Sequence, residues 1–289
     1  MKNIVKKKTN LIIGVLLVLC AVIVILVSAT AFSRQNREDS AQKSSSQESS
    51  SEEDVPDDSQ ESRTGESTAS EAQEIRSSLT RNEFPQLEVG MDVYELENEI
   101  LAITIYENVA VTTDTYSGSG FVWMEDEDGL WIATAAHVLA DGNGGTVEMV
   151  SVSEGWTDVE FSEEDVVRVD DYDLALIHLS ADTAETLLYI PLSSYIASEA
   201  QTGDEGWIVD SIYGSGTGIE QVTVANPLIY FEDYGTELLY LYGEGKEGMS
   251  GSPVYSAQGL LMGMVCGMSE DGTELAAVPV QVLEEQLSE

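Results

Sequence analysis

The chain has 289 residues, with 53 acidic against 12 basic side chains and a formal net charge of −41 at pH 7. Only two basic residues, Arg168 and Lys246, follow residue 90, so like-charge repulsion excludes nucleic acid and anionic lipid headgroups as partners of the C-terminal part. The acidity would attract cationic peptides or divalent ions, or serves only solubility, and it carries no information about the fold.

The first segment predicts a membrane anchor. Residues 11–32 form an apolar run without a charge, which exceeds the roughly 20 residues that a helix needs to cross a bilayer. Four lysines precede the run, and this excess predicts a cytoplasmic N-terminus at residues 1–10 and an exported remainder. The small residues Ala29 to Ala31 leave a cleaved signal peptide as the alternative, in which case the rest is secreted.

Residues 33–88 have the composition of a stalk. Ser, Glu, Gln and Asp dominate, and aromatic residues are scarce. Such a segment cannot bury enough apolar surface to offset the entropy of ordering its backbone. We therefore expect residues 33–88 to be disordered and a separate domain to occupy residues 89–289.

The pattern changes to short apolar runs from about residue 90. These runs are rich in Val, Ile, Tyr and Leu and are separated by Gly, Asp and Asn, which is typical of strands joined by turns. The predicted strands are residues 101–106, 109–113, 119–124, 131–135, 146–152, 166–169, 174–179, 206–209, 221–224, 238–242, 253–255, 260–266 and 274–278.

One helix is expected, at the C-terminal end. Val280, Leu283 and Leu287 fall on one face at helical spacing. Two sets of about six strands suit two packed β-barrels, although a single sandwich has the same pattern. The fold class predicted from this pattern is all-β with a C-terminal helix.

Three short segments contain side chains that could act together in catalysis. A strand ends in Thr-Ala-Ala-His at residues 134–137, and Asp173 stands immediately before an apolar strand. The third segment, Gly-Met-Ser-Gly-Ser-Pro at residues 248–253, places Ser250 in a glycine-flanked turn. The chain order His, Asp, Ser is that of the chymotrypsin-type arrangement.

Each of these residue types meets a specific chemical need. The Ser250 hydroxyl is a poor nucleophile until an imidazole, here His137, takes its proton. A carboxylate, here Asp173, fixes the tautomer of that imidazole and stabilises its charged form. Asp171 competes with Asp173 for this role, but Asp173 adjoins the apolar strand. The backbone N–H groups of Gly248 and Ser250 are the candidates for binding the oxyanion that forms on attack.

These segments resemble the bacterial trypsin-like serine peptidases of the chymotrypsin fold. The resemblance covers roughly residues 100–283 and includes Ser-Gly-Ser-Gly-Phe at 117–121, Thr-Ala-Ala-His at 134–137, Asp-Leu-Ala-Leu at 173–176, the 248–253 motif, and Val-Pro-Val at 278–280. It implies two six-stranded β-barrels with the triad in the cleft between them. It also implies peptide-bond hydrolysis through an acyl-enzyme, with no metal or organic cofactor.

The resemblance also suggests where a substrate binds. Glu244 lies in the region that floors the primary specificity pocket, where it would favour Lys or Arg through an ion pair; alternatively it faces solvent. Val265, Cys266 and Gly267 would form the strand that pairs with the substrate backbone. Ser252 stands where many members have Gly, as in glutamyl endopeptidases, but the histidine of those enzymes is missing near Val265 to Gly267.

The sequence therefore predicts a membrane-anchored serine endopeptidase outside the cytoplasm. Its partners are a protein or peptide substrate and, through residues 11–32, the membrane; nucleic acid is not expected. The alternatives are a catalytically silent surface module of the same fold and a solute-binding β-sandwich.

Overall fold

A computed structural model describes residues 61–88, 91–169, 171–197, 199–212 and 216–286. The predicted cytoplasmic segment, the predicted anchor at 11–32 and residues 33–60 of the predicted stalk lie outside this part. No helix within the described residues is long and apolar enough to cross a membrane.

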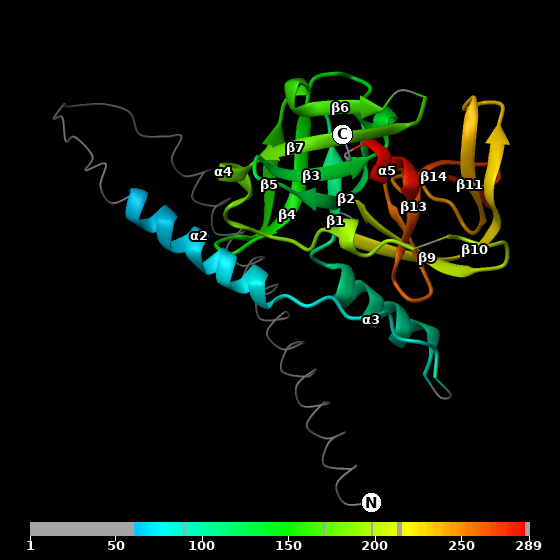
Figure 1. The fold of residues 1–289 in the computed structure, drawn as a ribbon, viewed down its shortest axis with the longest axis horizontal. Coiled ribbons are helices and arrows are strands. Elements are labelled where there is room, and N and C mark those ends of the chain that lie inside the picture. The colour runs from blue at the N-terminus through cyan, green and yellow to red at the C-terminus, as the bar shows by residue number, and fades with distance from the viewer. Residues whose placement is uncertain (1–60, 89–90, 170, 198, 213–215, 287–289) are drawn as a thin grey trace, which may run out of the picture. The chain divides into compact units, whose positions relative to one another are not determined.

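The described chain is mostly β-structure with short helices (Figure 1). The first half contains α2 (Glu61–Ser78), α3 (Val93–Thr104), β1 (Asn108–Thr112), β2 (Ser117–Glu125), β3 (Gly129–Thr134), η1 (Ala136–Leu139), β4 (Gly145–Ser151), β5 (Gly155–Phe161), η2 (Glu163–Asp165), β6 (Val166–Val169), β7 (Leu174–Ser180), α4 (Ala181–Ala184), β8 (Leu187–Leu188) and η3 (Leu192–Ser194). The second half contains β9 (Glu205–Ile212), β10 (Gly216–Phe231), β11 (Thr236–Tyr242), β12 (Pro253–Ser256), β13 (Leu261–Met268), β14 (Glu274–Pro279) and α5 (Val280–Gln286).

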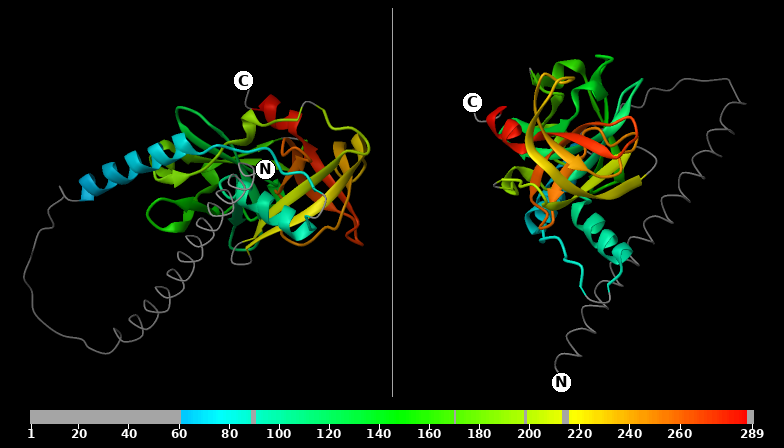
Figure 2. Two further views of the ribbon diagram at one scale, coloured as in Figure 1. Left: turned by 90° about the horizontal axis from the view of Figure 1, so that it is seen from below. Right: turned by 90° about the vertical axis from the view of Figure 1, so that its right-hand side faces the viewer.

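The strands form two antiparallel units. The first eight make one sheet in the order β5-β4-β1-β2-β3-β7-β6, with β8 paired to β4, and the last six close into the barrel β10-β11-β14-β13-β12-β9. The predicted pair of six-stranded barrels is thus replaced by one closed six-stranded barrel and one open sheet of eight strands. The two units lie side by side in Figure 1 and in the left view of Figure 2. They are joined through Ser119 in β2, whose N–H donates to the carbonyl of Ser250 at 2.8 Å.

The predicted strand at 101–106 is wrong, because this stretch belongs largely to α3. Asp92 caps the helix by accepting the N–H of Glu95 at 2.8 Å. Leu96, Ile100 and Thr104 are buried at intervals of four residues, which places them on one face. The β-branched residues near the end of this helix favoured a strand locally, and burial of one helical face against the core outweighed that preference.

Part of the segment predicted as a disordered stalk has secondary structure and contacts with the domain. Residues 61–78 form α2, and Arg76 donates to the carbonyls of Ala184, Glu185 and Leu187 at 3.2, 3.1 and 2.7 Å. The segment after this helix continues along the domain, with Phe84 only 3% exposed. We call residues 76–86 the N-terminal strap. A few well-placed contacts order it despite its polar composition.

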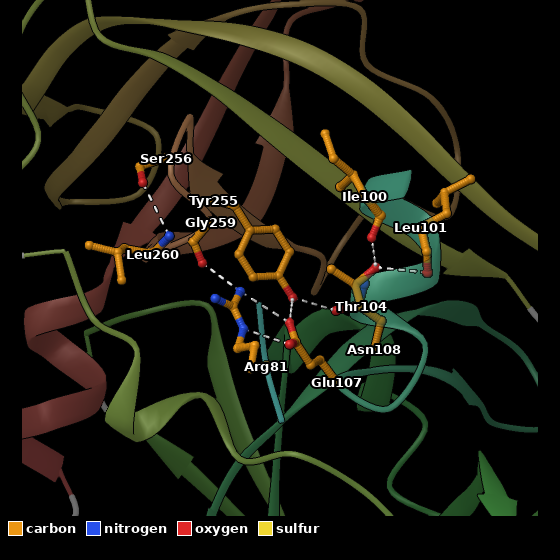
Figure 3. Close-up of polar contacts among 10 residues, drawn as sticks. All are labelled: Arg81, Ile100, Leu101, Thr104, Glu107, Asn108, Tyr255, Ser256, Gly259 and Leu260. Carbon is orange, nitrogen blue, oxygen red and sulfur yellow. Dashed lines mark hydrogen bonds and ion pairs between the residues drawn. The ribbon is translucent and has the colours of Figure 1, made fainter. Parts of the chain in front are cut away.

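A buried ion pair fastens the strap at the junction of the two units (Figure 3). Arg81 contacts Glu107 through Nε and Oε1 at 2.6 Å, and their side chains are 2% and 0% exposed. A second guanidinium nitrogen of Arg81 donates to the carbonyl of Gly259 at 2.5 Å. The Tyr255 hydroxyl donates to Glu107 at 2.9 Å and lies 2.9 Å from Oδ1 of Asn108. Since Glu107 lies between α3 and the first sheet while Tyr255 is in the barrel, this cluster connects the strap to both units.

Candidate active site

Strand pairing brings His137 and Asp173 together. β3 and β7 are antiparallel, with Thr134 opposite Ala175. The chain that leaves β3 and the chain that enters β7 therefore meet at one end of the sheet. There η1 carries His137, whose Nδ1 lies 2.5 Å from Oδ2 of Asp173. The backbone N–H of His137 donates to the other carboxylate oxygen at 2.9 Å.

This contact determines where the imidazole holds its proton. An ionised carboxylate only accepts hydrogen bonds, so Nδ1 of neutral His137 carries the hydrogen and Nε2 keeps a free lone pair. The side chain of His137 is 48% exposed and that of Asp173 is 17% exposed. The imidazole therefore faces the open side while the carboxylate stands behind it. Asp171 lies in the preceding turn with φ of 71°, and the carboxylate that contacts His137 is that of Asp173.

The turn around Ser250 depends on its two glycines. Gly248 and Gly251 both have φ of +90°, a conformation that other residues adopt only with strain. A Cβ on Gly251 would lie 1.9 Å from the carbonyl oxygen of Ser119. Gly251 donates to the carbonyl of Val265 at 2.8 Å and Ser252 to that of Met249 at 2.9 Å, so the turn is attached to β13 and closed on itself.

Ser119 holds this turn from the other unit. Its Oγ lies 2.9 Å from the carbonyl of Gly248 and 3.1 Å from that of Ser211, and it accepts the N–H of Ser211 at 3.0 Å. Thr134, at the end of β3, donates to the carbonyl of Ser119 at 2.7 Å. The sequence pointed to the Ser-Gly-Ser-Gly-Phe loop but assigned Ser119 no role. Ser119 lies two residues into a Gly-rich strand, opposite a second buried strand, and this position was the signal by which its role could have been recognised.

Two backbone N–H groups of the turn around Ser250 have no partner among the described residues. The carbonyl of Gly248 accepts from Ser119, and the N–H of Met249 donates to the carbonyl of Lys246, so the peptide unit between Gly248 and Met249 is held in one orientation. Within the described part of the chain, the N–H groups of Gly248 and Ser250 donate to no other group. Two unpaired donors on one tight turn make a favourable site for a negative oxygen.

One cleft of about 240 Å³ contains most of the predicted site residues. His137 comes from the first sheet, while Gly248, Ser250, Val265 and Gly267 come from the barrel side. His137 and Ser250 therefore line the same space, with one cleft wall on each unit.

Two predicted substrate-binding residues lie elsewhere. Glu244 is exposed and is not among the residues that line the cleft; the charged side chains there are Lys246 and Glu247. The side chain of Cys266 is buried, 2% exposed, with Sγ 3.4 Å from the carbonyl of Ala276. Burial raises the pKa of this thiol well above its usual range. Only the backbone of Cys266 is available to a ligand.

The remaining histidine has a structural position. His178 packs against Trp131 on the neighbouring strand, with ring centroids 4.6 Å apart and the ring planes tilted by 41°. Aromatic packing of this kind accounts for its presence, and it lies on β7 five residues beyond Asp173.

Comparisons with known proteins identify the family and the fold. A family model described as a trypsin-like peptidase domain matches residues 118–264, whereas a search of curated proteins finds no match. Among solved structures, an inactive form of mutant Rv3671c from M. tuberculosis H37Rv is 20% identical, with a TM-score of 0.50 over 71% of this chain and 95% of that one.

Two other solved structures are similar at the level of the fold. Deg5 is 18% identical, with a TM-score of 0.54, and the match covers 68% of this chain and 94% of that one. The MamO protease domain from Magnetospirillum magneticum is 18% identical, with a TM-score of 0.52 and coverage of 64% and 98%. The family match over half of the sequence, on the fold described above, shows that this chain belongs to the trypsin-like peptidase family and is a serine endopeptidase.

Proposed function

We propose that the chain hydrolyses peptide bonds with Ser250 as nucleophile, His137 as general base and then acid, and Asp173 as the orienting carboxylate. The observation that carries this proposal is the contact of 2.5 Å between His137 Nδ1 and Asp173, in a cleft that Ser250 also lines. No other described histidine has a carboxylate partner and a place in a cleft.

The chemistry proceeds in two halves. Ser250 Oγ attacks the carbonyl carbon while its proton passes to Nε2 of His137, and Asp173 stabilises the resulting imidazolium. The negative oxygen is bound by the N–H groups of Gly248 and Ser250; removing one such donor costs about 10²–10³ in rate. The leaving amine takes the proton from His137, and water, activated by the same imidazole, releases the acid from Ser250.

Fluorophosphonate labelling tests this assignment. The reagent phosphonylates an activated serine, so the intact chain should be labelled, and Ser250→Ala should abolish both labelling and peptide hydrolysis. Ser153→Ala, a substitution in an exposed turn, is the matched control and should behave as the unmodified chain. Labelling that persists in Ser250→Ala would exclude Ser250 as the nucleophile, and an unlabelled intact chain would favour the catalytically silent module.

We also propose that residues 11–32 anchor the enzyme in a membrane, with the peptidase on the outer side. The support is the apolar run with four lysines before it. A membrane-impermeant fluorophosphonate applied to intact cells should label Ser250, and the labelled protein should stay with the membranes after alkaline carbonate extraction. Labelling only after lysis would place the domain inside, and recovery in the medium would indicate cleavage after Ala31.

A further inference from the structure

One end of β13 has a free edge beside the cleft. β13 pairs with β14 as far as Met268, opposite Leu275, but with β12 only as far as Met264, opposite Pro253. Val265 is bonded to Gly251 and Ser252 on that side. Within the described chain, residues 266–268 have no strand partner there, so an extended peptide could pair with them as an additional strand.

Tyr234 lies against this free edge. It comes from the turn between β10 and β11, the hairpin coloured yellow at the right of Figure 1. Its hydroxyl donates to the carbonyl of Cys266 at 3.4 Å. A Cβ built on Gly267 would lie 1.8 Å from the hydroxyl oxygen of Tyr234. The tyrosine hydroxyl therefore occupies the space that a side chain at position 267 would fill.

The tyrosine lies outside the cleft, on the side of β13 to which a side chain at position 267 would point. Gly267 lines the cleft together with Ser250, whereas Tyr234 does not. Successive side chains of an extended peptide point to opposite faces. If the side chain before the scissile bond enters the cleft, the next one toward the N-terminus faces Tyr234.

The exposed part of Tyr234 is suited to an apolar side chain. The ring packs edge-on against Phe231, with centroids 6.2 Å apart, and 37% of the residue stays exposed. Burial and nearby acidic groups, Asp173 among them, raise its pKa to about 12, so the hydroxyl stays protonated and keeps its bond to Cys266. The ring is thus held in place with a partly bare surface toward solvent.

We propose that Tyr234 is a specificity-determining residue that supplies the wall missing at Gly267 and favours an apolar side chain two residues before the scissile bond. This proposal rests on the peptidase function proposed above. The β10–β11 hairpin then contacts the substrate, and no motif in the sequence marks this hairpin as a binding segment.

Peptide binding to a catalytically inactive variant tests whether Tyr234 contacts an apolar side chain of the substrate. In the full-length Ser250→Ala protein, binding of N-acetylated hexapeptide amides would be measured by affinity selection, with one position at a time fixed as Leu or Gly. One position should prefer Leu by about tenfold or more, because even one methylene in an apolar pocket is worth roughly 10–200-fold. Tyr234→Phe should keep this preference and Tyr234→Ala should reduce it to about twofold, whereas Tyr230→Ala, on the same hairpin and 59% exposed, should leave it unchanged.

A substitution in β13 tests the same contact between Tyr234 and Gly267. Gly267→Ala would place a Cβ where the Tyr234 hydroxyl lies and so displace the ring, and it should reduce the Leu preference at the same position. If Tyr234→Ala and Gly267→Ala both keep the full preference while their urea midpoints match the parent, the wall does not exist. Phosphonate labelling of the chain with Ser250 intact tests the peptidase function separately, so the two proposals fail by different results.

Discussion

Loss of the Arg81 guanidinium should destabilise the whole peptidase domain, although Arg81 lies in a stretch that the sequence predicts to be a stalk. Glu107 is 0% exposed and receives the guanidinium through two nitrogens, at 2.6 and 3.3 Å. In Arg81→Met the methionine stem fills much of the same volume, so the change removes the charge and its hydrogen bonds to Glu107 and Gly259 while keeping most of the packing. Glu107 would keep the Tyr255 hydroxyl as its remaining side-chain donor.

The expected cost follows from the burial of the pair. Removing one partner of a buried ion pair leaves an uncompensated charge and costs about 3–5 kcal/mol. That is a large share of the 5–15 kcal/mol by which a domain of this kind is stable. Arg168→Met is the matched control, because Arg168 pairs with Glu163 at the surface, with side chains 37% and 41% exposed. An exposed pair contributes at most about 1 kcal/mol.

The cost should depend on pH. Burial raises the pKa of Glu107 above its ordinary value of 4.5, and Arg81 opposes that rise. A carboxyl whose pKa is higher in the folded state binds protons more tightly there, so it lowers stability as pH rises through the folded pKa. Without Arg81 the folded pKa rises further. The deficit of Arg81→Met should therefore be larger at pH 8 than at pH 5.

Urea unfolding followed by tryptophan fluorescence measures these free energies. Adding Glu107→Gln to Arg81→Met should recover part of the loss, because a neutral amide can stay buried without a counter-charge. A deficit no larger than that of Arg168→Met, or one that is the same at pH 5 and pH 8, would refute the role assigned to the buried pair.

Three other substitutions or treatments test the site. Gly251→Ala should abolish fluorophosphonate labelling, because its Cβ would lie 1.9 Å from the Ser119 carbonyl, whereas Gly155→Ala, also at positive φ but with nothing within 4 Å of its Cβ, should keep it. Ser119→Ala removes the hydroxyl 2.9 Å from the Gly248 carbonyl and should lower kcat by about tenfold or more with little change in KM; an unchanged kcat would exclude a positioning role. Cys266 should resist Ellman's reagent until the protein unfolds, because burial raises the pKa of its thiol; rapid reaction in the native protein would contradict its place in the core.

Local pattern was sufficient where a residue's role depends on its neighbours in the chain. Alternating apolar runs marked most of the strands, and the helix after residue 280 followed from its spacing. The order of His137, Asp173 and Ser250, with glycine on both sides of the serine turn, indicated the chemistry without any coordinates. Such motifs are readable because the turn geometry that a reaction needs restricts which residues can occupy it.

The tertiary structure decided the features that depend on contacts between distant segments. The strap is ordered because Arg81 meets Glu107 and the carbonyl of Gly259, 26 and 178 residues away along the chain. The strand predicted at 101–106 became a helix because one helical face packs against the core, a gain that local propensity does not contain. Tyr234 contacts Cys266 at the free edge of β13, 32 residues away along the chain, and only folding brings these two residues together. Sequence pattern reports what neighbouring residues can form, whereas burial of charge and close packing are properties of the folded chain alone.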